Sequence, residues 1–333
     1  MAETLFIGQD EVKAVLAMPD CIDAVRQALA DLARGEGIQP LRPVMWLPDK
    51  VGALGMMPGY LGSIDTIGIK TITVFPGNAG TEYDSHQGTV MLFDAKNGRL
   101  KAVLDATEIT ATRTAAASAV ATEQLSRPDS SILAILGAGV QGNTHVRAIP
   151  LVRDITEIRV WSRNPDNAVR LVENTSGNGI KIHPAATVTE AVAGADIVCT
   201  TTASPNPILD GEMLEPGMHV NAVGSSVPFA RELDSDAMAK SRIFVDRRES
   251  TLHESGDFLM ARDDGAVTED DIVAEVGQVI VGSHPGREAE TDVTLFVSLG
   301  LAVEDIATGD LVYRRALESG QGVSMEFGGA RHD

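Results

Sequence analysis

The spacing of apolar residues along the chain predicts its helices and strands. Residues 20–34 carry apolar side chains at helical intervals and end before two glycines, which indicates an amphipathic helix. Residues 52–75 consist of short β-type runs interrupted by Gly, Pro and Asp. Farther along, two more such runs flank Asn97-Gly98, a dipeptide that favours the positive φ angles of a tight hairpin. The first part of the chain is therefore expected to combine a helix with antiparallel strands.

After residue 125, the pattern changes to strands and helices in alternation. Residues 107–125 are Ala-rich and predict a tightly packed helix, which the polar, Pro-containing segment 126–130 ends. Short apolar runs then recur between helical stretches, at residues 132–136, 158–161, 180–183, 197–200, 219–223, 243–246 and 293–298. Such alternation is typical of parallel strands joined by crossover helices. A last helix begins at residue 300, and the Gly-rich tail 320–333 is expected to be loosely ordered.

These patterns predict an α/β protein with two domains, since 333 residues exceed the usual size of one core. Residues 126–299 are expected to form a Rossmann-type domain with a doubly wound parallel sheet. Residues 1–125, completed by residues 300–333, are expected to form a separate α+β domain.

The charge balance argues against one class of partner. The chain has 27 Lys and Arg against 47 Asp and Glu, a formal net charge of -20, whereas a nucleic-acid surface needs concentrated positive charge. We therefore expect no nucleic-acid partner, and the same acidity repels anionic membranes. The sequence shows no secretory leader and no apolar run of membrane-spanning length, so a cytoplasmic location is expected. Cys21 and Cys199 lack the spacing of a disulfide framework or a metal site, and both are expected to be core residues.

A glycine-rich turn is the strongest chemical signal in the chain. The apolar run 132–136 leads directly into Gly137-Ala-Gly139-Val-Gln-Gly142, and a helical stretch follows. In this context the spacing is typical of a dinucleotide site. Gly137 permits a tight turn, Gly139 lets the backbone approach a pyrophosphate, and Gly142 allows the helix to pack closely on the strand. The N–H groups at the start of the helix would then face the phosphates.

The end of the next strand bears on the choice between NADH and NADPH. An NAD-specific protein usually places Asp or Glu here, on the ribose 2′-hydroxyl, but this chain has Ser162-Arg163-Asn164. A guanidinium suits a 2′-phosphate, so NADPH is the predicted cofactor and NADH the alternative. In the other interpretation Arg163 is a solvated or adenine-stacking side chain. Residues 200–202 and 223–226 follow later strands, where the nicotinamide is expected.

Two cations lie in apolar surroundings and therefore require anionic partners. Lys70 lies among Ile residues in a predicted strand, and Arg113 is the only charged residue between Glu108 and Glu123. A guanidinium in such a place can hold a carboxylate or phosphate by bidentate hydrogen bonds. The alternative for each cation is a structural salt bridge with an internal acid.

Three other polar residues have simpler interpretations. Glu304 and Asp305 lie near the start of a predicted helix, where negative charge interacts favourably with the helix dipole. Structure alone is expected to account for both. His86 is more typical of a hydrogen-bonded structural group than of a proton donor.

Several segments together resemble the ornithine cyclodeaminase/mu-crystallin family, and the match runs in order across nearly the whole chain. They are residues 113–119, the glycine turn, Ala222-Val-Gly224, Arg231-Glu-Leu-Asp234 and residues 296–307. The resemblance implies an NAD(P)H-dependent oxidoreductase, a homodimer in which the Rossmann domain is joined to a substrate-binding and dimerisation domain. It also implies that Lys70 and Arg113, assisted by Arg42, grip a substrate carboxylate, and that Thr89 contacts the cofactor.

One position departs from the cyclodeaminases of this family. They carry an Asp before Pro-x-x-x-Glu-Leu, whereas Ser226 occupies the matching position here. An unactivated hydroxyl is too weak a base for ammonia elimination, so the resemblance favours the ketimine and Δ1-pyrroline-2-carboxylate reductases. The predicted reaction reduces a cyclic imino acid to proline or pipecolate, with Ser226 hydrogen-bonded to the imine nitrogen or a relay water. An ornithine cyclodeaminase, an alanine-dehydrogenase-like enzyme and an NADPH-dependent small-molecule-binding protein remain as alternatives.

The predicted site residues form three groups, and none is a metal ligand. The catalytic residues are Lys70, Arg113 and Ser226, and the substrate-binding residues are Arg42, Lys70 and Arg113. The expected cofactor contacts are Thr89, Arg113, Gly137, Gly139, Val140, Gln141, Gly142, Ser162, Arg163, Asn164, Thr201, Thr202, Val223, Gly224, Ser225 and Ser298.

Overall fold

The structure, a computed structural model, describes residues 3–78, 80–175 and 179–327. Its internal contacts divide the chain into two units, and each unit is described by itself. Unit 1 comprises Met1–Arg113 and Leu301–Asp333, and unit 2 comprises Thr114–Gly300. The division therefore falls inside helix α3 (Ala106–Leu125). The expected domain boundary after residue 125 lies at the end of the same helix and stays a prediction.

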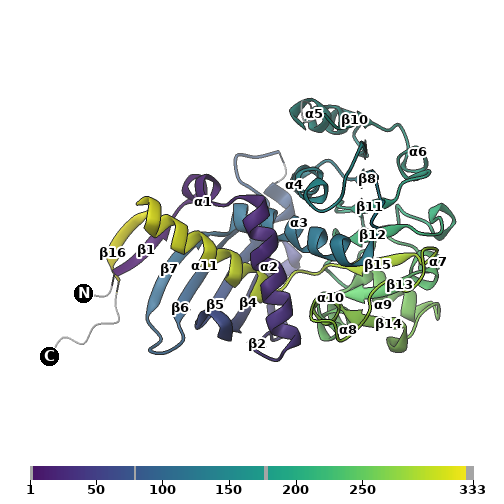
Figure 1. The fold of residues 1–333 in the computed structure, drawn as a ribbon. Coiled ribbons are helices and arrows are strands. Elements are labelled where there is room, and N and C mark those ends of the chain that lie inside the picture. The colour runs from purple at the N-terminus through teal and green to yellow at the C-terminus, as the bar shows by residue number, and fades with distance from the viewer. Residues whose placement is uncertain (1–2, 79, 176–178, 328–333) are drawn as a thin grey trace. The chain divides into compact units, whose positions relative to one another are not determined.

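Unit 1 combines a mixed β-sheet with a small number of helices (Figure 1). Its strands are β1 (Glu3–Ile7), β2 (Gly37–Ile38), β3 (Val44–Trp46), β4 (Ala53–Leu61), β5 (Thr66–Val74), β6 (His86–Asp94), β7 (Leu100–Asp105) and β16 (Val323–Glu326). Its helices are α1 (Gln9–Val15), α2 (Met18–Ala33), the first part of α3 and α11 (Ala302–Ser319), with short 3-10 turns η1 (Pro48–Lys50), η2 (Gly62–Ile64) and η3 (Pro76–Asn78). The helix expected at residues 20–34 is thereby confirmed.

The sheet of unit 1 is antiparallel apart from one pair. Within the described residues, eight strands form it in the order β16-β1-β7-β6-β5-β4-β2, with β3 also paired to β4. Strand β1 runs parallel to β7, and the other neighbours are antiparallel. The predicted hairpin joins β6 to β7, although only Gly98 of the Asn-Gly pair has a positive φ, at 74°.

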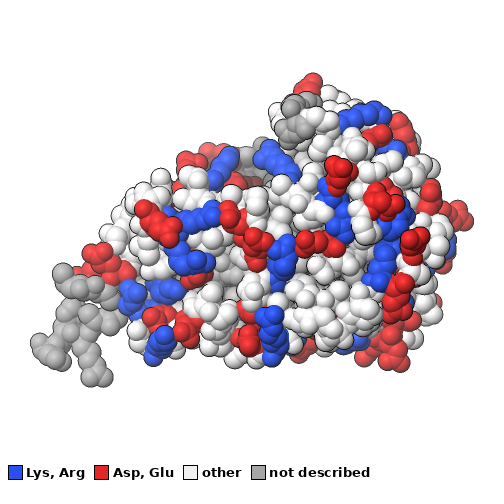
Figure 2. All heavy atoms as spheres, viewed as in Figure 1, with Lys and Arg blue, Asp and Glu red and all other residues white. Residues whose placement is uncertain are grey.

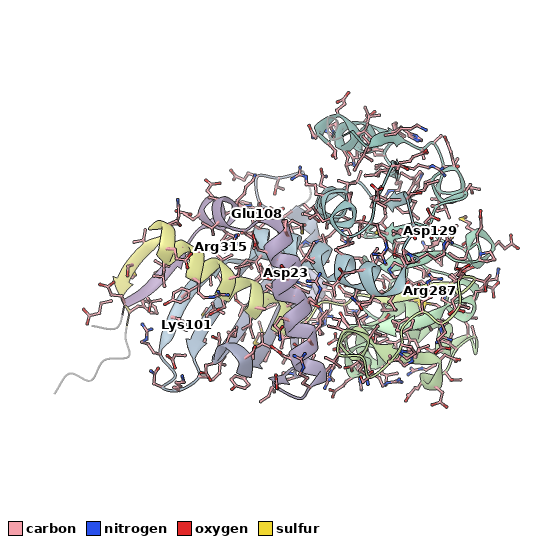
Figure 3. All side chains as sticks on the ribbon, in the orientation of Figure 1. Asp23, Lys101, Glu108, Asp129, Arg287 and Arg315 are labelled. Atoms are coloured by element: carbon pink, nitrogen blue, oxygen red, sulfur yellow. The ribbon has the colours of Figure 1, made fainter. Side chains whose placement is uncertain are left out.

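Helix α11 covers the face of this sheet that carries Lys70. In the register of the sheet, Lys70 of β5 lies between Met57 of β4 and Val90 of β6. A Cβ at Gly68, also in β5, would lie only 2.5 Å from a side-chain carbon of Ile306, so the glycine lets the helix pack close to the strands. At its far end α11 is tied to the neighbouring helices by Arg315, labelled in Figure 3, which pairs with Asp20 at 2.8 Å.

The tail of the chain differs from the expectation. Residues 323–326 were expected to be loosely ordered, but they form β16, which pairs antiparallel with β1. The prediction was wrong because exposed residues can form a strand when a free sheet edge supplies the backbone partners. The last residues of the tail, 328–333, lie outside the described part.

Unit 2 is a doubly wound α/β domain, as predicted. Its strands are β8 (Ile132–Leu136), β9 (Glu157–Trp161), β10 (Lys181–Pro184), β11 (Ile197–Thr200), β12 (His219–Ala222), β13 (Arg242–Val245), β14 (Ile272–Glu275) and β15 (Thr294–Val297). Its helices are the second part of α3, α4 (Val140–Ala148), α5 (Pro165–Thr175), α6 (Val188–Val192), α7 (Ser235–Lys240), α8 (Arg248–Glu254), α9 (Gly256–Asp263) and α10 (Val276–Ile280), with 3-10 turns η4 (Ile149–Leu151), η5 (Gly211–Met213) and η6 (Glu269–Asp271).

The strand order of unit 2 locates its ligand crevice. Within the described residues the sheet is wholly parallel, in the order β10-β9-β8-β11-β12-β15-β13-β14. From β8 the chain first adds strands on one side and then crosses to the other, so the order reverses between β8 and β11. In such sheets the ligand lies beyond the carboxyl ends of the strands at this reversal. The sequence predicted seven of these strands and did not predict β14.

The charges on the surface and the character of the helices bear on whether nucleic acid or a membrane is a partner. On the face that Figure 2 shows, basic side chains lie interspersed with acidic ones. Within the described residues, no helix has both the length and the apolar character needed to cross a membrane. The expectation that nucleic acid does not bind stays a prediction.

Candidate functional site

The two cations singled out in the sequence meet in one buried ionic cluster of unit 1. Lys70 of β5 and Arg113 of α3 are 2% and 5% exposed. Lys70 Nζ donates to Asp305 Oδ1 at 3.0 Å, and Arg113 Nε donates to the same oxygen at 2.9 Å. Arg113 Nη1 also donates to Glu304 Oε2 at 2.9 Å. Two cations and two carboxylates are thus held together below the protein surface.

Burial and neighbouring charge set the protonation of this cluster. Burial, and after it the charge of Arg113, lowers the pKa of Lys70 from 10.5 to about 8, although Asp305 opposes both effects. Burial also disfavours the charged form of Arg113, but Asp305 and Glu304 outweigh it and raise the pKa of the guanidinium overall. The half-buried Arg42 is close enough for its charge to contribute to the lowered pKa of Lys70. The structure therefore brings all three predicted substrate-binding cations near one another.

The interpretation of Glu304 and Asp305 from sequence was incomplete. They do lie in the first turn of α11, where the helix dipole favours acids. They are also the counterions of Lys70 and Arg113, because both carboxylates are fully buried and bonded to them. A signal was available: two cations in apolar surroundings require acids, but periodicity does not say which acids, since 235 positions separate Lys70 from Asp305.

Two other predicted residues of β6 lie on opposite faces of the sheet. His86 pairs in register with Val74, and alternation of side chains puts both on the face of Lys70. Burial lowers the pKa of His86, Asp84 opposes that shift, and Lys70 adds to it. Thr89 pairs with Thr71, hydroxyl to hydroxyl at 3.0 Å, on the face opposite Lys70. The register therefore does not bring Thr89 together with the cluster.

The glycine turn of unit 2 has the geometry of a dinucleotide site. Gly137 has φ 121°, which a residue with a side chain rarely adopts. A Cβ at Gly142 would lie 2.0 Å from the carbonyl oxygen of Gly137, whereas a Cβ at Gly139 would meet nothing within 4 Å. The N-cap of α4 is Gly139, so no side chain caps the first N–H groups of this helix. These N–H groups, with Val140 exposed beside them, fit a bound pyrophosphate.

The segment after β9 contains a cationic side chain, that of Arg163, with no protein partner in the described residues. Asn164 Oδ1 accepts a hydrogen bond from the N–H of Asp166 at 3.1 Å, so its side chain shapes the start of α5. Arg163 is exposed and makes no hydrogen bond or ion pair within the described residues. Its guanidinium is therefore available to an anionic ligand. Ser162 is half-buried beside it.

The predicted nicotinamide-side residues mostly use their side chains to hold the protein together. Thr201 Oγ1 donates to the carbonyl of Gly137 at 3.1 Å, and thus supports the glycine turn. Ser225 Oγ donates to the carbonyl of Ala230. By contrast, the buried hydroxyl of Ser298 has no hydrogen-bond partner within the described residues. Half-buried Ser226 makes no hydrogen bond in that part of the chain either.

Sequence reasoning assigned no role to Glu232, although its carboxylate occupies the centre of this region. The side chain is fully buried. Oε1 accepts from the backbone N–H and the hydroxyl of Thr202, both at 2.6 Å, and Oε2 accepts from the N–H of Gly224 at 2.7 Å. Burial raises the pKa of Glu232 to about 7, the hydrogen bonds from Thr202 oppose the shift, and the charge of Asp257 adds to it. The Pro-x-x-x-Glu-Leu pattern was the available signal, but it did not indicate what the Glu contacts.

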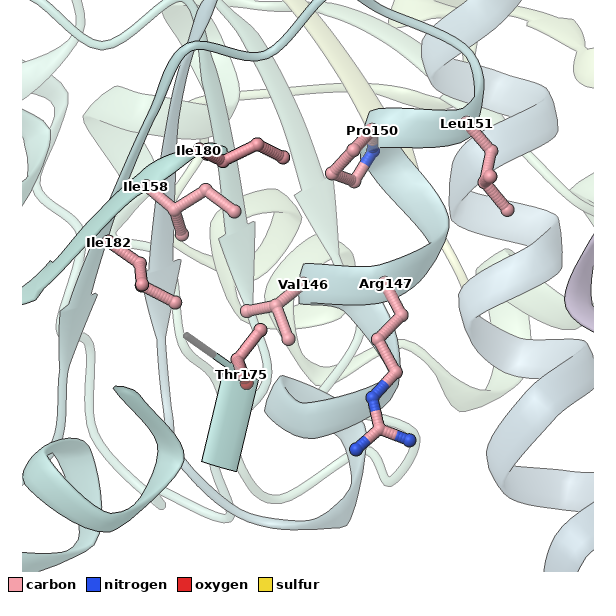
Figure 4. Close-up of a pocket in the computed structure, with 8 residues that line it drawn as sticks. All are labelled: Val146, Arg147, Pro150, Leu151, Ile158, Thr175, Ile180 and Ile182. Atoms are coloured by element: carbon pink, nitrogen blue, oxygen red, sulfur yellow. The ribbon is translucent and has the colours of Figure 1, made fainter. Parts of the chain in front are cut away.

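A cavity elsewhere in unit 2 is not part of this site. It has a volume of about 230 Å³ and is lined mainly by apolar side chains, among them Val146, Ile158 and Ile182 (Figure 4). Ile158 and Ile182 lie near the amino ends of β9 and β10. The glycine turn follows the carboxyl end of β8, so the cavity and the turn lie at opposite ends of the strands.

Comparisons with known proteins agree on one family. The model of the Ornithine cyclodeaminase/mu-crystallin family matches residues 2–320. Ketimine reductase mu-crystallin of Mus musculus is 41% identical over 312 residues, which cover 92% of this chain and 96% of that protein. The structure of Thermococcus litoralis Δ1-pyrroline-2-carboxylate reductase in complex with NADH and L-proline matches with a TM-score of 0.93 at 36% identity, over 96% of this chain and 99% of that chain. An archaeal alanine dehydrogenase dimer with bound NAD matches with a TM-score of 0.93 at 31% identity, over 98% and 99%.

Proposed function

The chain belongs to the ornithine cyclodeaminase/mu-crystallin family, and from that membership we propose that it reduces a cyclic imino acid with a nicotinamide cofactor. The substrate is a cyclic 2-imino carboxylate, such as Δ1-pyrroline-2-carboxylate or Δ1-piperideine-2-carboxylate. The product is the corresponding amino acid, proline or pipecolate. A ketimine reductase and a Δ1-pyrroline-2-carboxylate reductase among the similar proteins support this reaction class.

The convergence of Lys70 and Arg113 on one carboxylate oxygen carries the proposal. Both donate to Asp305 Oδ1, at 3.0 and 2.9 Å, so their spacing suits a carboxylate. Arg113 donates hydrogen bonds from Nε and Nη1 to the two internal acids, whereas its Nη2 makes no hydrogen bond within the described residues. A substrate carboxylate takes up this remaining donor and the charge of Arg42, which acts on the same cluster.

The residues of the chain bind and orient the substrate. The glycine turn would hold a reduced nicotinamide dinucleotide, which would supply the hydride. Lys70 and Arg113 anchor the carboxylate in surroundings without bulk water, which strengthens their attraction to it. The protonated imine accepts the hydride at the carbon of its C=N bond, and the π electrons become the lone pair of the amine nitrogen. We assign Ser226 a hydrogen bond to this nitrogen or to a relay water.

Oxidation of NADPH and of NADH, followed at 340 nm with Δ1-pyrroline-2-carboxylate, tests the proposal. Wild type turns over, and Lys70→Met lowers kcat/KM about a hundredfold because one charged hydrogen bond to the substrate is lost. The matched control is Lys101→Met, since Lys101 also joins a strand to α11 through an acid, Asp310, at 2.9 Å. The control retains activity. Absence of turnover in wild type rejects the substrate class, and full activity in Lys70→Met rejects the role of the lysine.

For the cofactor we propose a preference for NADPH over NADH. Arg163 supports it, because its exposed guanidinium stands where NAD-specific proteins usually place an acid. The two solved relatives carry NADH and NAD, so the preference needs its own measurement. Arg163→Asp should reverse the ratio of KM values for NADPH and NADH. An unchanged ratio would show that Arg163 does not select the 2′-phosphate.

A second candidate is the reductive amination of a keto acid. The likeness to an archaeal alanine dehydrogenase, with a TM-score of 0.93, favours it. Pyruvate with ammonia replaces the cyclic imine in the same assay. Turnover with this pair, and none with the cyclic imines, would favour the second candidate.

We also propose that a second copy of this chain covers the open face of the sheet in unit 1. The face opposite Lys70 carries several apolar side chains beside the polar Thr71 and Thr89, and none of the apolar ones is buried; they include Leu54, Met56, Tyr60, Ile67, Ile69, Met91 and Phe93. Exposed apolar surface of this kind marks an interface, and the archaeal relative is a dimer. Sedimentation of wild type as a dimer and of Ile67→Lys as a monomer is expected. The control is Val169→Lys, a substitution at an exposed apolar position of unit 2. A dimeric Ile67→Lys variant would contradict the proposed interface.

A further inference from the structure

Glu232 connects two neighbouring strands at the end of the sheet where the crevice opens. One carboxylate oxygen holds Thr202, which lies just beyond β11, and the other holds Gly224, which lies just beyond β12. These two strands are adjacent and parallel, so their carboxyl ends meet at the same edge. The loops approach so closely that a Cβ at Gly224 would lie 2.0 Å from the carbonyl oxygen of Thr202.

A second buried carboxylate holds Glu232 itself in place. Asp257 Oδ1 accepts from the N–H of Glu232 at 2.8 Å and from the N–H of Leu233 at 2.9 Å. Asp257 is 1% exposed and lies in α9. The backbone carbonyl of Glu232 accepts from the N–H groups of Ile208 and Leu209, at 2.7 and 3.0 Å. Glu232 is therefore anchored on both sides before its side chain reaches the loops.

The hydrogen bonds that Glu232 accepts favour its ionised form, although the side chain is buried. All three donors are neutral, and no Lys or Arg is paired with this carboxylate within the described residues. Only the ionised form accepts freely at both oxygens, and burial works against that form. Only a carboxylate accepts at both oxygens and so holds both loops, and it does so against the cost of burial.

We propose that Glu232 is a positioning residue for the cofactor: by clamping Thr202 to Gly224 it orients the nicotinamide half of the dinucleotide. This inference rests on the proposed cofactor and goes beyond it, because Glu232 acts through the two loops. In Glu232→Gln, the amide nitrogen cannot accept a hydrogen bond, so one half of the clamp opens. The glycine turn and α4, which hold the adenine half, make none of these bonds and keep their geometry.

The test compares a whole cofactor with a fragment that lacks nicotinamide. Binding of NADH or NADPH, whichever wild type binds more tightly, is measured by the fluorescence of the reduced nicotinamide. Binding of ADP-ribose, or of its 2′-phosphate, is measured by calorimetry. In Glu232→Gln the affinity for the whole cofactor should fall about tenfold, with an altered emission of the bound ring. The affinity for the fragment should not change.

Glu215→Gln is the matched control. Glu215 accepts a hydrogen bond from the N–H of Gly194 at 3.1 Å, and these residues precede β12 and β11. It thus joins the same two strands at their opposite ends, away from the crevice, and its loss should leave both affinities unchanged. Thr202→Val is the second variant if Glu232→Gln does not fold, and it should weaken the whole cofactor severalfold without affecting the fragment.

Three outcomes would overturn the inference. Wild-type affinity and emission in Glu232→Gln would show that the clamp does not orient the ring. An equal loss for the whole cofactor and the fragment would show that Glu232 only supports the fold. Failure of wild type to bind either dinucleotide would overturn the proposed function as well, and this result is distinct from the first two because it appears without any substitution.

Discussion

Replacing Lys70 by Met separates a functional lysine from a structural salt bridge. The pKa of Lys70 is lowered from 10.5 to about 8 by burial and by Arg113, even with Asp305 beside it. A shift of this size corresponds to about 3 kcal/mol by which the folded state disfavours the protonated lysine. The folded protein therefore carries a cation that costs stability at pH 7. Met fills a similar volume without the charge, and Asp305 keeps its hydrogen bond from Arg113.

The expected result is a protein with a kcat/KM about a hundredfold below that of wild type and a stability at least equal to it. Urea unfolding at pH 7 should give Lys70→Met a free energy of unfolding equal to that of wild type or up to about 3 kcal/mol above it. As the pH rises from about 8 towards 10.5, folded Lys70 loses its proton before the unfolded chain does. Over that range wild type gains stability relative to the variant, so the difference between their free energies of unfolding becomes smaller.

A large loss of stability in Lys70→Met would refute this reasoning. Removing one partner of an essential buried ion pair usually costs about 3–5 kcal/mol. A drop of that size at pH 7 would identify Lys70 as the structural partner of Asp305. Lys101→Met provides the comparison, since Lys101 is partly exposed and its pair with Asp310 lies outside the cluster.

Three further predictions follow from the buried charges and the glycine turn. Asp305→Asn leaves two buried cations without the acid between them, so urea unfolding should show a loss of about 3–5 kcal/mol; a change below about 1 kcal/mol would contradict this. Gly142→Ala places a Cβ 2.0 Å from the carbonyl oxygen of Gly137. Cofactor affinity, measured by fluorescence, should therefore fall at least about tenfold. Unchanged binding would show that the backbone of the turn can shift to accommodate the methyl group. Glu232, whose pKa is raised from 4.5 to about 7, takes up its proton more readily in the folded state. Wild type should therefore lose stability as the pH rises from about 4.5 through 7, and unfolding of Glu232→Gln at pH 5 and 7.5 should lack that part of the decline.

The parallel domain could be predicted because its signals are local. The glycine turn follows its strand directly, and the structure gives Gly137 the positive φ and Gly142 the close packing that the spacing implied, while the role of Gly139 stays a prediction. The inner strands of unit 2, such as β8 and β11, were visible as short apolar runs because a parallel sheet buries both faces of its inner strands. Strand β14 was missed because it is short and follows an acidic turn, η6.

The buried ionic cluster could be predicted only in part, since its cations stand out in the sequence and their partners do not. Lys70 and Arg113 stand out because each is a charge in apolar surroundings. Asp305 lies at a helix start and Glu232 in a Pro-containing loop, both of which have ordinary local explanations, and their contacts join distant parts of the chain. Strand β16 was missed for the same reason, because it exists through its pairing with β1 at the other end of the sequence.

The position of α11 in the chain has a consequence for biosynthesis. Lys70 and Arg113 leave the ribosome early, but Asp305 follows Lys70 by 235 positions, after the whole of unit 2. Domains generally fold as they emerge, so the parallel sheet can close while the first sheet still waits for its covering helix. A nascent chain interrupted before residue 302 would hold two cations with no acids to neutralise them. Completion of the buried ionic cluster is thereby coupled to translation through α11.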